Sequence, residues 1–122
     1  MIVQTASISA FDGQEKMVPY AAAKGAVVSM TLPMARDLAP LGVRVCAIAP
    51  GGVLTPRVSS PQVQELLIED VLFPKRLGRP EEFAHLVEAI VTNPYLNGEV
   101  IRFDGGTRLG PAMGHRRRAE RG

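Results

Sequence analysis

The chain has 122 residues, 46% of them apolar, which is the length and composition of one soluble globular domain. Its formal net charge is +2, and residues 110–122 alone contribute +3 through four arginines against Glu120, so the remainder carries −1. No apolar run approaches the roughly 20 residues of a membrane-spanning helix, and the N-terminus lacks a basic leader followed by a cleavable apolar stretch. We therefore expect a cytoplasmic protein.

The first predicted element is a short apolar strand from Met1 to Ser7. A loop, Ser9 to Pro19, follows it. The longest predicted element is a helix from Tyr20 to Leu38, which is rich in Ala, Met and Leu. It ends where Pro40 and Gly42 interrupt the pattern, because both residues are typical of helix ends.

A second strand is predicted from Val43 to Ala49. Its nearly continuous apolar and β-branched sequence is typical of a parallel strand that is covered on both faces. The chain has a single cysteine, Cys46, so it cannot form an internal disulfide, and we expect it to pack as a small buried apolar residue. The strand ends at Pro50-Gly51-Gly52, a sequence typical of a turn.

Two amphipathic helices are predicted next. Ser60-Pro61 provides an N-cap and a first-turn proline for the first helix, and Pro80 followed by two glutamates opens the second, which Asn93-Pro94 closes. His85 lies in the second helix with no other metal ligand at suitable spacing, which favours a packing or surface role over metal binding. The apolar stripes of the two helices are Val63, Leu66, Leu67 and Val71, and Phe83, Leu86, Val87, Ile90 and Val91.

A last strand is predicted within Gly98 to Gly106, which ends in a glycine turn. Strands that alternate with helices predict an α/β fold with about three parallel strands and right-handed crossovers. Residues 110–122 are rich in Gly and Arg, and we expect them to form a disordered basic tail after a folded unit of residues 1–109. No aromatic residues are interleaved with these arginines, so we expect no nucleic-acid or membrane partner.

Ser7, Tyr20 and Lys24 could form a hydride-transfer site. Residues four apart project from one face of a helix, so Lys24 can stand beside Tyr20, and the first strand can deliver the Ser7 hydroxyl. A tyrosine titrates near pH 10, but an ammonium group within about 4 to 6 Å favours the phenolate and lowers its pKa. The serine can hold a substrate oxygen while a nicotinamide exchanges hydride. A lone Tyr-x-x-x-Lys pair also arises by chance on helix surfaces.

Several further motifs accompany these three residues in order along the chain. The motifs are Thr5-Ala6-Ser7, Tyr20 with Lys24, Ile48-Ala49-Pro50-Gly51 with Thr55-Pro56, Arg76-Leu77-Gly78-Arg79-Pro80-Glu81-Glu82, and Asn97-Gly98 through Asp104-Gly105-Gly106. With them, the chain from Met1 to Leu109 resembles the short-chain dehydrogenase/reductase family. The resemblance implies that Ser7 and Tyr20 contact the substrate, with Ser7 positioning the reacting oxygen and Tyr20 transferring the proton. It implies that Lys24 lowers the pKa of Tyr20 and that both residues bind the cofactor, Lys24 at the nicotinamide ribose.

The resemblance also assigns the turn after the second strand to the cofactor. It implies that Pro50, Gly51 and Val53 contact the nicotinamide carboxamide, and that Thr55 meets the carboxamide or the diphosphate. Glycine would let the backbone approach a flat ring, because it has no Cβ. An ordinary turn at the end of a strand is the alternative interpretation of the same residues.

Within the family, residues 30–40, 83–87 and 93–102 look most like the type 2 3-hydroxyacyl-CoA dehydrogenases, also called type 10 17β-hydroxysteroid dehydrogenases. This likeness suggests a 3-hydroxyacyl thioester as the substrate, with a steroid-like alcohol or ketone as the alternative. The family resemblance implies NAD as the cofactor, with NADP left open. It also implies a homo-oligomer, commonly a tetramer.

Members of the family begin with a strand and a glycine-rich turn that binds the cofactor pyrophosphate. No Gly-x-x-x-Gly-x-Gly or Asn-Asn-Ala-Gly sequence occurs here. We therefore expect the C-terminal half of a Rossmann-type doubly wound parallel sheet, without the nucleotide-binding half and inactive in isolation. Two functions stay open: a dehydrogenase, and a non-enzymatic module that associates with full-length relatives.

Overall fold

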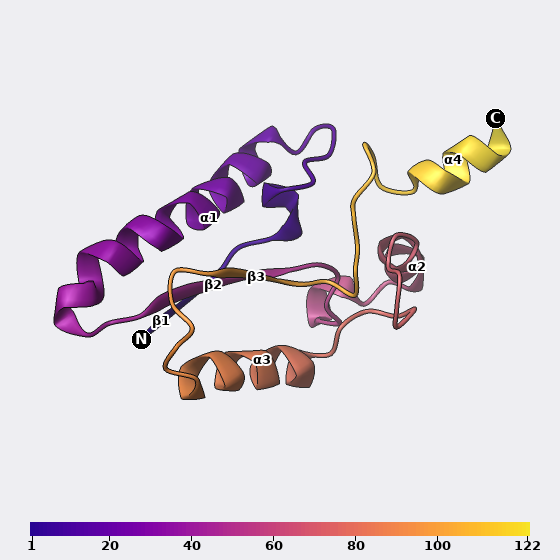
Figure 1. Ribbon diagram of the computed structural model, residues 1–122. Helices are drawn as coiled ribbons and strands as arrows, with labels where there is room; N and C mark the ends of the chain where they lie inside the picture. Colours follow the sequence, from indigo (N-terminus) through magenta and orange to yellow (C-terminus); the bar gives the residue numbers. More distant parts are fainter.

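The computed structural model describes all 122 residues and shows a three-stranded parallel sheet with helices on both faces (Figure 1). The strands β1 (Ile2–Thr5), β2 (Val45–Pro50) and β3 (Val100–Phe103) lie side by side in that order. Helix α1 (Val18–Leu38) covers one face and α3 (Pro80–Thr92) covers the other. The predicted α/β fold with about three parallel strands is confirmed. None of the helices combines the length and the apolarity that crossing a bilayer requires.

The middle strand β2 forms the centre of the core. Its residues from Val45 to Ala49 have no exposed surface, as expected of a strand covered on both faces. Cys46 and Ile48 pack with Ile90 of α3, whereas α1 packs on β2 from the other side, in keeping with the alternation of side chains along a strand. The prediction that Cys46 is a buried packing residue is confirmed.

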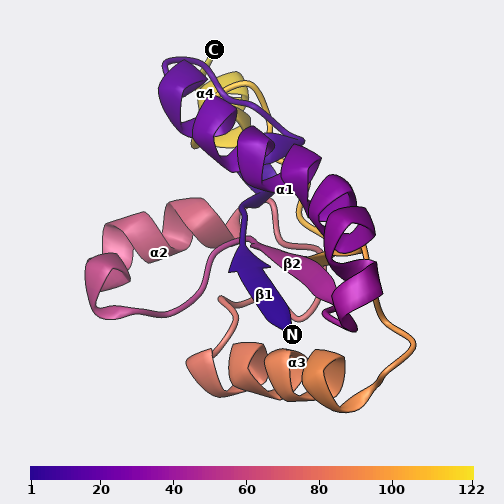
Figure 2. The ribbon, with the colours of Figure 1, turned by 90° about the vertical axis from the view of Figure 1, so that its left-hand side faces the viewer.

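The two crossover connections differ in hand. The chain steps from β1 to β2 to β3 in one direction, first through α1 above the sheet and then through α3 below it (Figure 2). Two crossovers that step in the same direction through opposite faces have opposite hands, so the prediction of right-handed crossovers is wrong for one of them. The connection from β2 to β3 contains a further helix before α3.

The carboxyl ends of the three strands meet at one edge of the sheet. Thr5 pairs with Ile48, and Ile48 pairs with Ile101, so the strands are in step along their length. The segments that follow them, which begin at Ala6, Gly51 and Asp104, therefore leave the sheet together. In open parallel α/β sheets this edge is where ligands bind.

Several element boundaries differ from the predicted ones. Helix α1 begins at Val18, because proline at position 19 is compatible with the first turn of a helix. The 3-10 helices are η1 (Ile8–Ala10), η2 (Ala39–Leu41) and η3 (Pro56–Val58). Helix α2 is Pro61–Ile68, so the predicted stripe residue Val71 lies beyond it. Ser60 occupies the N-cap of α2, but its hydroxyl contacts the Gln62 side chain and makes no capping bond to the backbone.

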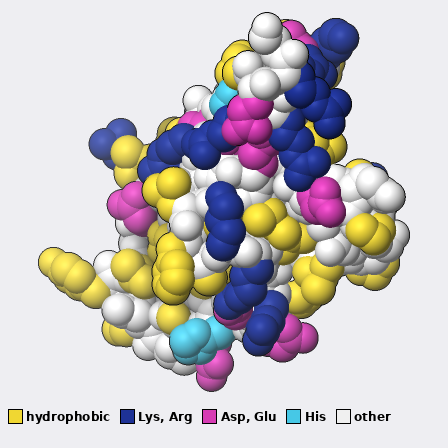
Figure 3. All heavy atoms as spheres, turned by 90° about the vertical axis from the view of Figure 1, so that its right-hand side faces the viewer, with side chains coloured by type: hydrophobic (Ala, Val, Ile, Leu, Met, Phe, Trp, Pro, Cys, Tyr) yellow, Lys and Arg dark blue, Asp and Glu magenta, His cyan; other side chains and the backbone are white.

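The C-terminal segment forms a short helix, α4 (His115–Arg121), where the sequence predicts a disordered tail. Its arginines meet acidic side chains from two other parts of the chain: Arg116 with Asp70 (3.2 Å), Arg117 with Glu65 (3.3 Å) and Arg118 with Glu15 (3.8 Å). Figure 3 views the molecule from the right-hand side of Figure 1 and shows basic and acidic side chains interspersed in its upper part. Composition alone predicted disorder because it takes no account of acidic partners elsewhere.

Candidate active site

Ser7 lies just beyond the carboxyl end of β1 and is the N-cap of η1. Its side chain is buried, and its Oγ accepts a hydrogen bond of 3.1 Å from the backbone N–H of Ser9. This bond uses a lone pair of the oxygen, so the hydroxyl hydrogen stays available to donate. The local turn therefore fixes the position of the oxygen and leaves its donor free for another group.

Tyr20 and Lys24 lie one turn apart near the N-terminus of α1, as predicted. The ammonium of Lys24 donates a hydrogen bond of 3.0 Å to the carbonyl oxygen of Thr5, the last residue of β1. Helix α1 also packs against η1, the turn that Ser7 opens. The structure thus brings Lys24 to the end of the strand that precedes Ser7. Tyr20 is 43% exposed, as a residue that contacts a substrate must be.

The predicted cofactor-binding residues lie in the segment that leaves β2. Pro50 is the last residue of β2, and the N–H of Gly51 donates to the carbonyl oxygen of Phe103 at 2.9 Å. Val53 forms an isolated parallel bridge with Gly78. Thr55 is the N-cap of η3, and its side chain makes no capping bond. Backbone contacts to β3 and to residue 78 thus fix this segment at the carboxyl edge of the sheet.

Packing explains the glycines of this segment. A Cβ at Gly51 would lie 3.0 Å from the Cβ of Asp104 and 3.4 Å from Cδ1 of Ile8. A Cβ at Gly52 would lie 2.7 Å from Cδ2 of Leu77. A Cβ at Gly51 would require Asp104 to move by a few tenths of an ångström, and a Cβ at Gly52 would require the Leu77 methyl group to shift, so glycine fits both positions without adjustment.

A cluster of three charged residues, Asp12, Arg102 and Asp104, lies at the same edge. The Arg102 guanidinium binds both carboxylate oxygens of Asp12, at 3.1 and 2.7 Å, and its Nε donates to Asp104 at 2.7 Å. The hydrogen bond from Arg102 lowers the pKa of Asp12 below its ordinary value, while burial opposes this and the amide of Leu109 adds to it. The bond to Asp12 likewise raises the pKa of Arg102, with burial opposing it.

Sequence reasoning missed this cluster. The available signal is an arginine in the middle of β3, whose other residues, Val100, Ile101 and Phe103, are apolar. A charged residue inside an apolar strand requires a partner, because burying an unpaired charge is costly. The spacing gives no indication of which partner, since Asp12 and Arg102 are 90 residues apart.

A hollow of about 460 Å³ lies between α3 and β3. Polar side chains of Arg76, Glu82 and His85 contribute to its walls, and Ser7, Tyr20 and Lys24 do not. Gly52, Arg102 and Asp104 also line it, so the hollow reaches the carboxyl edge of the sheet next to the predicted cofactor segment. Tyr20 and Lys24 belong to α1 and take no part in its walls.

Known proteins are similar to this chain in sequence and in fold. A family model described as enoyl-(acyl carrier protein) reductase matches residues 1–108. The human 3-hydroxyacyl-CoA dehydrogenase type-2 is 55% identical over 113 residues, which are 91% of this chain and 43% of the relative. The crystal structure of 3-hydroxyacyl-CoA dehydrogenase type-2 from Mycobacterium avium superposes with a TM-score of 0.86 at 44% identity, covering 90% of this chain and 43% of that one.

A second solved structure, the angucycline C-6 ketoreductase LanV with bound NADP, is 25% identical with a TM-score of 0.79. The match covers 88% of this chain and 43% of LanV. The chain thus spans less than half the length of each of these relatives.

Proposed function

Because the chain belongs to the short-chain dehydrogenase/reductase family, whose members are oxidoreductases, we propose that it carries the catalytic residues of an enzyme for NAD-dependent interconversion of 3-hydroxyacyl-CoA and 3-ketoacyl-CoA thioesters, and that the 122 residues are inactive in isolation. One observation carries the proposal: Lys24 binds the end of β1, two residues before Ser7, from the helix that also bears Tyr20. The similarity to 3-hydroxyacyl-CoA dehydrogenases type-2 from man and Mycobacterium avium supports the thioester as the substrate.

The residues at the carboxyl edge fit a nicotinamide cofactor. Lys24 uses one of its three N–H donors on Thr5, which leaves two for the ribose hydroxyls. The backbone from Gly51 to Thr55 leaves the sheet at the same carboxyl edge, and the neighbour LanV carries NADP in its structure. When bound, the nicotinamide would accept the hydride from the alcohol carbon. We propose NAD as the cofactor of this chain.

Three side chains would handle the oxygen and its proton. Ser7 donates its free hydroxyl hydrogen to the substrate oxygen, and the bond from the Ser9 N–H holds the Ser7 Oγ in place. Tyr20 takes the proton of the alcohol hydroxyl during oxidation and returns it during reduction. Lys24, one turn from Tyr20 on α1, would place its ammonium on the same face of the helix. Each role uses an atom that the surrounding structure leaves exposed or free to donate.

Substitution of Tyr20 tests the dehydrogenase proposal. In a full-length version of the protein, Tyr20→Phe is expected to remove nearly all turnover of NAD with a 3-hydroxyacyl-CoA, measured as NADH absorbance, and to leave NAD affinity within a few fold. Tyr95→Phe is the matched control, because Tyr95 is 97% exposed in the connection between α3 and β3. Retained activity in Tyr20→Phe would end the proton-transfer role. Absence of turnover in the unmodified full-length version would refute the dehydrogenase proposal as a whole.

A second candidate function is association with another chain of the same family. Strand β1 pairs only with β2, so its other edge offers unpaired backbone groups. Val18 and Leu32 of α1 are exposed although apolar. Mixing with a full-length 3-hydroxyacyl-CoA dehydrogenase should give a complex in light scattering that Leu32→Lys weakens, whereas Leu41→Lys in η2 serves as the control. Separate elution of the two proteins would exclude this function.

A further inference from the structure

We propose that Arg102 and Asp12 are positioning residues for the proposed dehydrogenase reaction: their ion pair holds the turn that presents the Ser7 hydroxyl. The inference rests on the proposed function, because it assigns a purpose to the position of Ser7. Neither residue is among the predicted catalytic or cofactor-binding residues. The pair joins two segments that are 90 residues apart at the carboxyl edge of the sheet.

Four hydrogen bonds hold the guanidinium of Arg102. Two parallel bonds, 3.1 and 2.7 Å, reach the two oxygens of Asp12, and this bidentate arrangement fixes direction as well as distance. Its Nε donates to Asp104 at 2.7 Å, and Nη2 also donates to the carbonyl oxygen of Thr107 at 2.8 Å. Four of its five N–H groups are therefore used. The side chains of Asp12 and Arg102 are 13% and 20% exposed, so water screens their interaction only partly.

Asp12 closes the turn that Ser7 opens. The Ser7 carbonyl oxygen accepts from the N–H of Ala10 at 3.0 Å, and the Ile8 carbonyl oxygen accepts from the N–H of Asp12 at 2.9 Å. Together with the Ser9 bond to the Ser7 Oγ, these bonds make residues 7–12 one continuous turn. Whatever fixes the carboxylate of Asp12 therefore fixes the end of the turn on which the Ser7 hydroxyl is placed.

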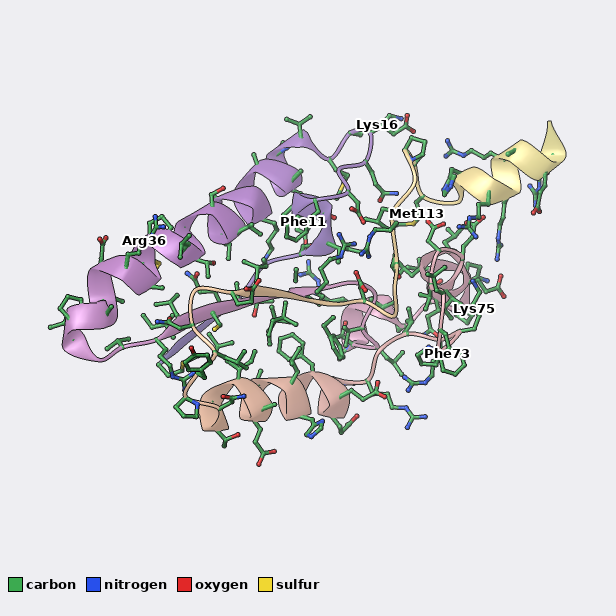
Figure 4. All side chains as sticks on the ribbon, in the orientation of Figure 1. Phe11, Lys16, Arg36, Phe73, Lys75 and Met113 are labelled. Carbon is green, nitrogen blue, oxygen red and sulfur yellow. The ribbon has the colours of Figure 1, made fainter.

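A second contact joins Arg102 to the same turn. The guanidinium carbon lies 5.3 Å from the centroid of the Phe11 ring, within the range of a cation–π contact. Figure 4 shows Phe11 in the space between α1 and the sheet. The adjacent residues Phe11 and Asp12 thus both contact the Arg102 guanidinium, Asp12 through its carboxylate and Phe11 through its ring.

Asp104, the third member of the cluster, lies against the turn after β2 that is predicted to bind the nicotinamide. Asp104 accepts from Arg102 through Oδ2 and from the N–H of Gly106 through Oδ1, at 2.7 and 2.9 Å. Its Cβ is the atom that a Cβ at Gly51 would approach to 3.0 Å. Arg102 therefore connects the Ser7 turn with the end of β2. Hydride transfer requires the substrate oxygen and the ring to be aligned, and a misplacement of about 1 Å can cost about 100-fold in rate.

The first test separates positioning from binding. In the full-length version, Arg102→Gln is expected to lower kcat by about 10- to 100-fold while KM for the thioester changes by less than about threefold. Asp12→Asn should behave alike, and Asp12→Glu, which keeps a carboxylate, should restore most of the rate. The double variant Asp12→Asn with Arg102→Gln should lose no more than either single variant, because both remove the same bond. A rise in KM with unchanged kcat would overturn the proposal.

The second test does not depend on turnover. Amide hydrogen exchange of Ser9, Ala10 and Asp12 should accelerate by at least about tenfold in Arg102→Gln. Arg108→Gln is the control, since Arg108 also meets Asp104, at 3.4 Å, but its side chain is 65% exposed. Should Arg102→Gln fail to fold, Arg102→Lys is measured in its place, because lysine keeps the positive charge but cannot form the two parallel hydrogen bonds of a guanidinium.

The two tests distinguish failure of the inference from failure of the dehydrogenase proposal. If the unmodified full-length version shows no turnover, the dehydrogenase proposal fails, and exchange at the turn alone decides whether Arg102 holds it. Unaltered exchange at Ser9, Ala10 and Asp12 in the Arg102 variant overturns the inference, whether or not the chain is active.

Discussion

Truncation of Ile48 to alanine should remove a large share of the stability of the fold. Ile48 lies in the middle of β2, has no exposed surface, and packs with Cys46 and Ile90. The change removes three carbon atoms, worth about 2.4 kcal/mol of transfer free energy at about 0.8 kcal/mol each. The cavity left between β2 and α3 raises the expected loss to about 3 to 5 kcal/mol. Domains of this size have only about 5 to 15 kcal/mol in total.

Urea unfolding followed by far-ultraviolet circular dichroism measures this loss. The midpoint should fall while the slope with urea is unchanged, because the surface exposed on unfolding stays nearly the same. Val91→Ala is the control, since Val91 follows Ile90 on α3 and is 48% exposed, and its loss should stay below about 1 kcal/mol. A loss below about 1 kcal/mol for Ile48→Ala would refute the position of β2 at the centre of the core.

Three further substitutions test charge and packing. Hydrogen bonds from Arg76 and from the amide of Arg79 lower the pKa of Glu82 from 4.5 to about 2, so its contribution to stability is present above pH 4.5 and lost as pH falls toward about 2. Glu82→Gln should therefore flatten the fall of the thermal midpoint over that range, and an unchanged slope contradicts this. Gly52→Ala should destabilise the chain by about 1 to 3 kcal/mol in urea unfolding, because its Cβ would meet Leu77. Gly25→Ala, where no atom lies within 4 Å, should stabilise α1 by about 0.5 to 1 kcal/mol, and a loss there would show a crowded site.

Local patterns were sufficient to predict most of the elements. The continuous apolar sequence of β2 predicted a doubly covered strand, and α3 begins at Pro80 as its N-terminal signals indicate. The hand of the second crossover could not be predicted, because it depends on which face α3 covers. Nothing in the sequence of α3 specifies a face, since both faces of β2 are equally apolar.

The candidate site was only partly accessible from the sequence. The spacing of Tyr20 and Lys24 on one helix follows from helix geometry, and the structure places them there. The contact between Lys24 and the Thr5 carbonyl depends on how α1 packs on η1, which spacing does not specify. The pairing of Asp12 with Arg102 is a tertiary contact between distant segments, and local periodicity contains no information about it.

The opposite hands of the two connections keep α1 and α3 apart by the full thickness of β2. Tyr20 and Lys24 belong to one flank, and the aromatic and aliphatic cluster around Ile90 belongs to the other. A substitution in that cluster can alter the melting temperature and leave the chemistry of the opposite flank alone. Substitutions that change thermal stability and substitutions that change the candidate active site can thus accumulate independently, because strand β2 separates the two groups of residues.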